Sequence, residues 1–183
     1  MPVTIVGMEL RTNALILRPW KLDDAPAIAE ACSDPEIARW LPMIPSPYGE
    51  EDAVSFIGQA HENWKRGEAY NFAILDAAGR RLAGSIAMRV LRFNTGHFGY
   101  WVTREARGHG GATEALKTLS RWAVDTLDIK RLELLTDPEN VASQRVAKRA
   151  GFQREGLLRS SLEYRDGSRR DSILFSALPD ELV

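Results

Sequence analysis

Glycines gather in one short segment of the chain, residues 107–112, which reads Arg-Gly-His-Gly-Gly-Ala. A backbone without Cβ atoms can bring its N–H groups close to a ligand. The segment runs directly into a helical pattern, and the start of a helix carries a partial positive charge. Together these two features are a common way of holding a phosphate or pyrophosphate. The sequence therefore predicts an anion site at this segment, which we call the glycine loop.

Three kinds of phosphate loop contain glycines in this way, and a turn without a ligand is the remaining alternative. A P-loop needs a Gly-Lys pair, which the sequence lacks. The dinucleotide fingerprint needs a glycine where this chain has Thr113, and it belongs to a βαβ unit. The third pattern is Arg/Gln-x-x-Gly-x-Gly/Ala, the pyrophosphate loop of acetyl-CoA-dependent N-acetyltransferases. The glycine loop matches it at every position, so this is the interpretation that we favour.

The spacing of apolar residues predicts the elements that must hold the loop in place. Strands are expected over residues 15–20, 70–75, 81–91, 96–103, 131–135, 152–159 and 170–178. Helices are expected from Asp23 or Asp24 to about Pro35, and over 50–66, 112–127 and 141–150. Asn140 is the predicted N-cap of the last helix. The order β-α-α-β-β-β-α-β-α-β-β favours a single α/β domain over residues 1–183, with one mixed sheet flanked by helices.

Composition argues against several classes of function. The chain has 24 basic and 25 acidic residues, so nothing favours nucleic acid or an anionic membrane surface as a partner. No stretch free of Asp, Glu, Lys and Arg approaches the ~20 residues that cross a bilayer, and no signal peptide is predicted. The single cysteine, Cys32, is expected to be a buried apolar side chain. We expect a cytoplasmic protein without a metal site, because no cluster of Cys, His and carboxylates has ligand spacing.

Several phrases of the sequence resemble the GNAT superfamily and, within it, the ribosomal-protein N-terminal acetyltransferase branch. They are Leu17-Arg18-Pro19, Gly99-Tyr100-Trp101, Ala106-Arg107-Gly108-x-Gly110, Thr113-Glu114-Ala115-Leu116, Asn140-x-x-Ser143, Arg149-Ala150-Gly151-Phe152 and Glu155-Gly156. They occur in order and cover nearly the whole chain. The resemblance implies a mostly antiparallel sheet in which two strands splay apart, and acetyl-CoA as the acetyl donor. It is also compatible with a homodimer.

The resemblance further implies where acetyl-CoA would bind. Backbone groups of the strand before the glycine loop, at Trp101, Val102 and Thr103, would bind the pantetheine arm. Asn140 would cap its helix and also reach this arm, with Ser143 one helical turn further on. Arg107 would add charge to a row of N–H groups that hold the pyrophosphate. That row comprises Gly108, His109, Gly110, Gly111, Ala112 and Thr113.

Acetyl transfer to an amine needs a base, stabilisation of the thioester oxyanion, and a proton for the leaving thiolate. The Val102 N–H is the candidate for the oxyanion. Many family members place a tyrosine seven residues after the asparagine, but this chain has Ala147, which leaves Ser143 as the local acid. For the base we favour His97, which strand alternation puts on the same face as Trp101. The resembled branch often has Glu at the position of His97. Purely structural roles for Ser143 and His97 are the alternatives.

The acceptor pocket is expected between the loop at Trp40–Tyr48, the helix over 50–66 and the hairpin at Glu163–Arg170. Carboxylates in this region would favour a cationic amine. The first hypothesis is therefore an N-acetyltransferase that acts on a protein N-terminal amine, such as that of a ribosomal protein, or on a small-molecule amine. The second is a CoA-binding regulatory module without turnover. The third is a nucleotide-binding oxidoreductase.

Overall fold

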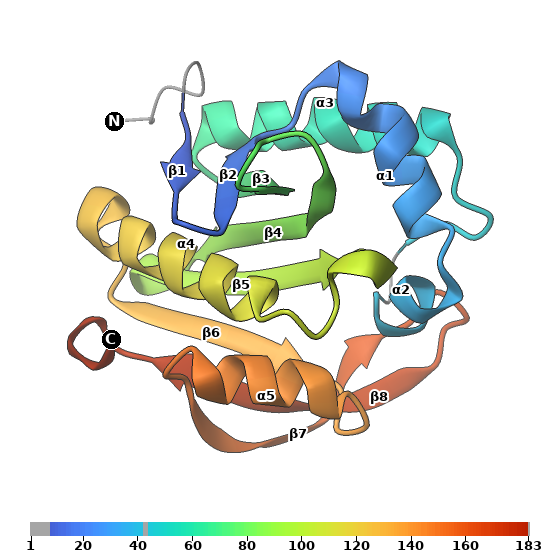
Figure 1. The fold of residues 1–183 in the computed structure, drawn as a ribbon. Helices are drawn as coiled ribbons and strands as arrows, with labels where there is room; N and C mark the ends of the chain where they lie inside the picture. Colours follow the sequence, from blue (N-terminus) through green and yellow to red (C-terminus); the bar gives the residue numbers. More distant parts are fainter. Residues whose placement is uncertain (1–7, 42–43, 183) are drawn as a thin grey trace.

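Eight strands form one sheet in the computed structural model, which describes residues 8–41 and 44–182 (Figure 1). Their order across the sheet is β1-β2-β3-β4-β5-β6-β8-β7. Neighbouring strands are antiparallel except β5 and β6, which are parallel. The strands are β1 (Leu10–Arg11), β2 (Leu15–Pro19), β3 (Ala69–Asp76), β4 (Leu82–Leu91), β5 (Thr95–Val102), β6 (Arg131–Thr136), β7 (Gln153–Glu163) and β8 (Arg169–Ala177). The predicted mixed, mostly antiparallel sheet is confirmed.

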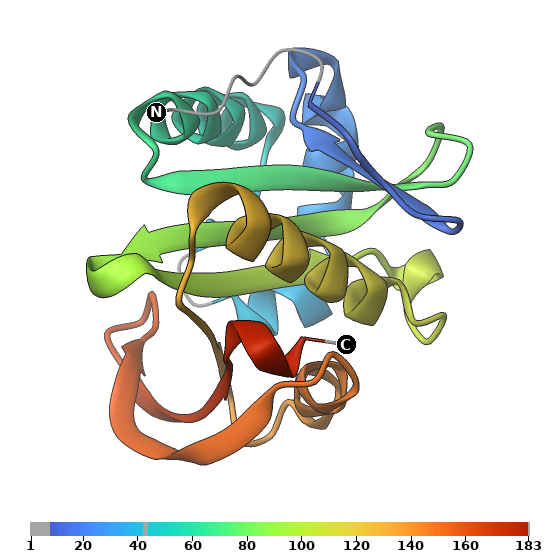
Figure 2. The same ribbon diagram turned by 90° about the vertical axis from the view of Figure 1, so that its left-hand side faces the viewer.

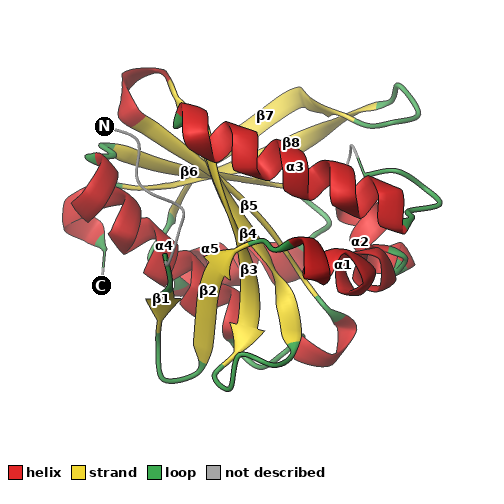
Figure 3. Ribbon diagram, turned by 90° about the horizontal axis from the view of Figure 1, so that it is seen from above, coloured by secondary structure: helices red, strands yellow, loops and turns green. Residues whose placement is uncertain are grey.

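Helices cover both faces of this sheet. They are α1 (Ala25–Cys32), α2 (Pro35–Trp40), α3 (Glu50–Arg66), α4 (Gly111–Leu127) and α5 (Val141–Arg149). In Figure 1, α4 and α5 lie in front of the sheet and α3 lies behind its upper part, and Figure 3 looks down on α3 and α1. Buried side chains form two clusters, one mainly between the sheet and α4 with α5, the other between the sheet and α1 with α3. No helix among the described residues is long and apolar enough to cross a membrane.

The largest difference from the predicted elements lies at Pro35. The sequence predicts that this proline ends the first helix, whereas α1 already ends at Cys32 and Pro35 begins the separate helix α2. Asp34 caps α2, since its carboxylate accepts the backbone N–H of Glu36 at 3.0 Å. Proline suits the first position of a helix because the N–H that it lacks would have no helical partner there. The two-residue strand β1 was not predicted either.

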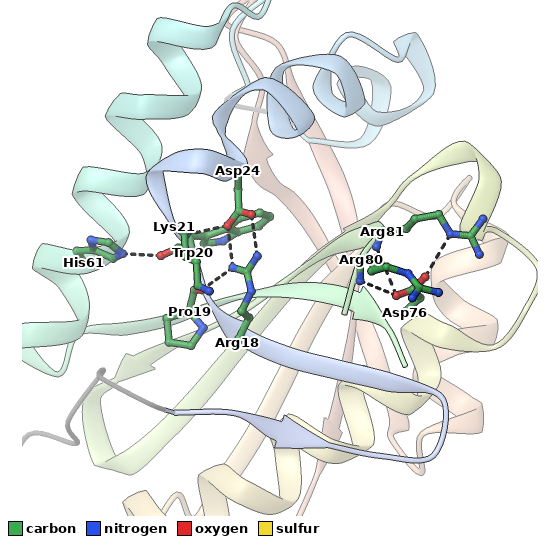
Figure 4. Close-up of polar contacts among 9 residues, drawn as sticks. All are labelled: Arg18, Pro19, Trp20, Lys21, Asp24, His61, Asp76, Arg80 and Arg81. Atoms are coloured by element: carbon green, nitrogen blue, oxygen red, sulfur yellow. Dashed lines mark hydrogen bonds and ion pairs between the residues drawn. The ribbon is translucent and has the colours of Figure 1, made fainter. Parts of the chain in front are cut away.

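Polar contacts tie β2 and the segment that follows it to neighbouring helices (Figure 4). The Arg18 guanidinium donates to both carboxylate oxygens of Asp24, at 2.8 and 2.7 Å. A ring nitrogen of His61, on α3, lies 2.8 Å from the carbonyl oxygen of Trp20. Trp20 itself is almost fully buried against Phe56 and Trp101. His61 therefore serves the packing of α3 onto the sheet.

The parallel strands β5 and β6 stay together for only part of their length. They pair from Thr95 to Phe98 on β5 and from Arg131 to Leu134 on β6. Beyond these residues β5 continues along β4 as far as Val102, and β6 continues along β8 as far as Thr136. Figure 2 shows β7 and β8, in orange and red, curving away from the stack of β3, β4 and β5. The predicted splay between two strands is thus confirmed.

Candidate active site

Two residues of the glycine loop have a backbone conformation that favours glycine. Gly108 and Gly110 have φ angles of 80° and 81°, which side chains with a Cβ rarely adopt. Gly110 is the N-cap of α4, a helix of 17 residues that begins at Gly111. A Cβ atom built at Gly108 or Gly110 would meet no heavy atom within 4 Å. Gly108 and Gly110 are therefore explained by their positive φ angles, and not by packing against other parts of the protein. The space beside them leaves the loop open to a ligand.

One backbone N–H at the end of β5 faces the splay. The Thr103 N–H donates to the carbonyl oxygen of Ala83 on β4 at 2.9 Å, and strand alternation turns the Trp101 N–H to the same side. The Val102 N–H consequently points away from β4, toward the opening between β5 and β6. The Trp101 side chain stacks on Trp20, with ring centroids 6.4 Å apart. Of the three residues predicted to bind pantetheine through their backbone, Val102 has the suitable orientation.

A bulge in β4 shapes this end of β5. The pairing of β3 with β4 shifts by one residue between Gly84 and Leu82, and Gly84 lies opposite Val102. A Cβ atom at position 84 would lie 2.3 Å from the Trp101 carbonyl oxygen and 3.1 Å from the Val102 Cα. Only glycine allows β4 and β5 to approach so closely at this point. Sequence analysis did not single out Gly84, because the close approach depends on a neighbouring strand.

Arg107 makes contacts that the sequence did not predict. Its guanidinium donates to Asp34 at 2.7 Å and to the carbonyl oxygen of Val102 at 3.3 Å. The Asp34 carboxylate is almost fully buried, and Arg104 lies 3.5 Å from its other oxygen. The N–H of Glu36 and the charge of Arg107 lower the pKa of Asp34. Arg107 thus links the glycine loop to the start of α2 and to the end of β5, and its charge is balanced by a carboxylate.

Asn140 and Ser143 lie together at the start of α5, on the other side of the splay. The Asn140 side-chain oxygen accepts the Ser143 N–H at 3.0 Å, which confirms the predicted N-cap. The Ser143 hydroxyl lies 2.9 Å from the hydroxyl of Tyr100, a residue of β5. Burial raises the pKa of Tyr100 to about 12. The sequence motif Gly99-Tyr100-Trp101 gave Tyr100 no role; its place two residues before the end of β5, on the opposite face to Trp101, was the available signal.

His97 lies partly buried in a row of charged side chains across the sheet. In register with it are Arg89 on β4 and Glu133 on β6. Burial and the charge of Arg89 lower the pKa of His97, and Glu133 opposes this shift. The imidazole is therefore neutral near pH 7 and able to accept a proton. His109, in the glycine loop, is exposed.

A charged groove of about 560 Å³ lies beside the start of α5. Its lining comes from α2, from the turn between β6 and α5, and from the start of β8: Arg39, Asp137, Pro138, Glu139, Arg170 and Asp171. Asp137 is buried, with one oxygen 3.4 Å from the Tyr164 hydroxyl and 3.9 Å from Arg170. The described lining of the groove shares Arg170 with the predicted acceptor pocket, and Arg39 lies one residue before the predicted loop, whereas α3 contributes no residue to this lining.

The GNAT acetyltransferase domain model matches residues 14–153, which include both sides of the splay and the glycine loop. The chain belongs to the GNAT acetyltransferase family. This acetyltransferase is 29% identical over 174 residues to the N-acetyltransferase p20 of Bacillus licheniformis, covering 94% of this chain and 97% of that protein. It is 27% identical to the [ribosomal protein uS5]-alanine N-acetyltransferase of Escherichia coli, covering 91% and 89%.

Solved structures agree with these sequence matches. The acetyltransferase is similar to Mycobacterium smegmatis RimJ in complex with CoA-disulfide, with a TM-score of 0.85, 26% identity, and coverage of 96% of this chain and 88% of that one. The relatives thus support the ribosomal-protein branch that the motifs predicted. Like other members of its family, this acetyltransferase is an acyltransferase, and GNAT acetyltransferases use acetyl-CoA.

Proposed function

We propose that this acetyltransferase, acting as one domain over residues 1–183, transfers the acetyl group of acetyl-CoA to a primary amine. The acceptor that its relatives favour is a protein N-terminal amine, and a small-molecule amine is the alternative. The observation that carries the proposal is that the glycine loop and the Asn140–Ser143 turn follow the two parallel strands just where these strands separate. An anion site and a strand with a free N–H thereby share one opening.

Different residues of the chain bind the two halves of acetyl-CoA. The N–H groups from Gly108 to Thr113 hold the pyrophosphate. The space beside Gly108 and Gly110 gives access to the loop, and the start of α4 provides a partial positive charge. The Val102 N–H and Asn140 bind the pantetheine arm. When bound, acetyl-CoA supplies a thioester whose carbonyl carbon an amine can attack directly.

The proposed chemistry uses both faces of the sheet. The Val102 N–H stabilises the negative charge that develops on the carbonyl oxygen. His97, neutral near pH 7, takes the proton of the attacking amine through water, because it lies five residues before Val102 on the extended strand β5, at ~3.3 Å per residue. Ser143 donates a proton to the leaving sulfur. The groove at Asp137 and Arg170 adjoins Ser143 through the turn between β6 and α5, and we assign it to the acceptor.

Thermal unfolding with and without acetyl-CoA tests the donor half of this proposal. Acetyl-CoA at ~100 times its dissociation constant adds about 2.7 kcal/mol of stability. For a domain of this size we expect a rise in Tm of roughly 5–10 °C. NAD at the same concentration is the control and leaves Tm unchanged. A rise with NAD alone would contradict the assignment.

Release of CoA from acetyl-CoA tests the acceptor half. Peptides with alanine or serine at the N-terminus, the residues that relatives are named for, are compared with the same peptides blocked at the N-terminus. Turnover with free peptides alone supports a protein N-terminal amine. Turnover only with small amines points to the alternative, and binding of acetyl-CoA without turnover on any amine would overturn the proposed transfer.

A further inference from the structure

Tyr100 and Ser143 join two elements across the splay. Tyr100 lies on β5 two residues beyond its last pair with β6, and Ser143 lies in the first turn of α5. Their hydroxyl oxygens are 2.9 Å apart, and Tyr100 is also 3.4 Å from the Ser143 carbonyl oxygen. The Ser143 backbone is fixed by Asn140 at the same time. Both the position of Ser143 and the surroundings of its hydroxyl are therefore set by neighbours.

The direction of this hydrogen bond follows from the acidity of the two groups. Either hydroxyl can donate in this contact. We take the Tyr100 hydroxyl as the donor and the Ser143 hydroxyl oxygen as the acceptor, because a phenol is a stronger acid than an aliphatic alcohol. Tyr100 remains protonated because burial keeps its pKa high. With its oxygen accepting from Tyr100, Ser143 has its own proton free to point elsewhere. The hydroxyl of Ser143 is also made a better donor, because hydrogen bonds in a chain polarise one another.

We propose that Tyr100 is a positioning residue that aims and polarises the Ser143 hydroxyl toward the leaving sulfur, an inference that rests on the proposed function. The resemblance to the family implies a tyrosine at position 147 of α5, where this chain has Ala147, and Tyr100 brings a phenol to the same helix from the sheet. The amine nitrogen bonds to the acetyl carbon as the carbon–sulfur bond breaks. Ser143 gives its proton to sulfur and regains one from water, equal to the proton that His97 passes to water, while Tyr100 keeps its own proton and its hydrogen bond to Ser143.

A double-mutant cycle on acetyl transfer tests this coupling. Tyr100→Phe, Ser143→Ala and the double variant are compared with the unmodified enzyme at saturating acceptor. We expect each single variant to lower kcat by about 10-fold or more, with KM for acetyl-CoA within about twofold. The double variant should lose no more than Ser143→Ala alone, because Tyr100 acts through Ser143. Losses that multiply in the double variant would overturn the proposal.

Calorimetric binding provides a readout that does not depend on turnover. CoA and desulfo-CoA, which lacks the sulfur, are titrated into each protein. The unmodified enzyme should bind CoA more tightly, and both Tyr100→Phe and Ser143→Ala should lose this preference while desulfo-CoA binds as before. Tyr70→Phe, which alters another buried tyrosine of the same core cluster, is the matched control and should keep it. A preference that survives in Tyr100→Phe contradicts the proposal.

The two levels of inference fail in different ways. If the unmodified enzyme binds neither CoA nor acetyl-CoA, the proposed function itself is wrong. If it binds acetyl-CoA and turns over, yet Tyr100→Phe matches Tyr70→Phe in kcat and in CoA preference, only the role of Tyr100 is wrong. Should Tyr100→Phe fail to fold, an unchanged kcat in Ser143→Ala would still overturn the proposal, because Tyr100 is proposed to act through the Ser143 hydroxyl.

Discussion

At the scale of single residues, His97 is the side chain whose protonation should govern the rate. Its pKa lies below the ordinary value because burial and Arg89 disfavour the charged form. The neutral form is the base, so kcat/KM should rise with pH through a pKa below about 6.5 and then level off. His97→Gln should lower kcat/KM by about 100-fold and abolish this rise. Arg89→Gln is the diagnostic partner: it should move the rise to higher pH. A pH profile that Arg89→Gln leaves unchanged would speak against His97.

Gly110 offers a second residue-scale prediction, because its positive φ and its open side have different consequences. Alanine at a left-handed position costs roughly 1–2 kcal/mol. Gly167, in the turn between β7 and β8, has a φ of 78° and an equally open side, so it is a matched control. Gly110→Ala and Gly167→Ala should lower Tm alike, and Gly110→Ala alone should weaken acetyl-CoA binding, about tenfold or more. Gly110→Trp should abolish it. Equal affinities for acetyl-CoA in the two alanine variants would mean that the glycine loop is not part of the acetyl-CoA site.

At the scale of elements, the approach of β4 to β5 depends on Gly84. A valine there would push against the Trp101 carbonyl oxygen, which its Cβ would meet at 2.3 Å. Overpacking of this kind costs typically 1–3 kcal/mol. We expect Gly84→Val to lower Tm and to raise KM for acetyl-CoA, because Val102 is displaced. Gly99→Ala, on the same sheet with no heavy atom near its Cβ, should change neither. Unaltered KM in a folded Gly84→Val enzyme would mean that Val102 does not contact the donor.

The link between α2 and the glycine loop is the second prediction at this scale. Asp34→Asn keeps a side-chain oxygen for the Glu36 N–H but loses the charge that holds Arg107. We expect KM for acetyl-CoA to rise about threefold to tenfold with a small change in Tm, whereas Asp34→Ala should also lose about 1 kcal/mol for the cap. Glu62→Gln, which removes an exposed ion pair with Lys65, is the control. If Asp34→Asn binds acetyl-CoA more tightly than the unmodified enzyme, Arg107 is a phosphate ligand for which Asp34 competes.

For the whole molecule, local patterns predicted most of the sheet, both long helices and the Asn140 cap, since these depend on neighbours in the sequence. The start of a helix directly after the glycine loop followed from the local pattern in the same way. What escaped prediction depends on distant partners. Nothing near Gly84 in the sequence shows that β5 approaches it, nothing near Arg107 shows Asp34, and nothing near Tyr100 shows Ser143. The groove at Asp137 likewise gathers residues from α2, the turn after β6, and β8.

The single parallel pairing in the sheet has a wider consequence. In an antiparallel sheet, successive connections alternate between the two ends of the strands, so helices that follow neighbouring strands seldom begin side by side. Because β5 and β6 run in the same direction, the segments that follow them begin at the same end of the strands, and α4 and α5 both start there. The proposed anion site therefore depends on the connectivity of the sheet. Loops at the other connections do not lead into these two helices, so we expect a change in their length to alter the choice of acceptor without altering the donor.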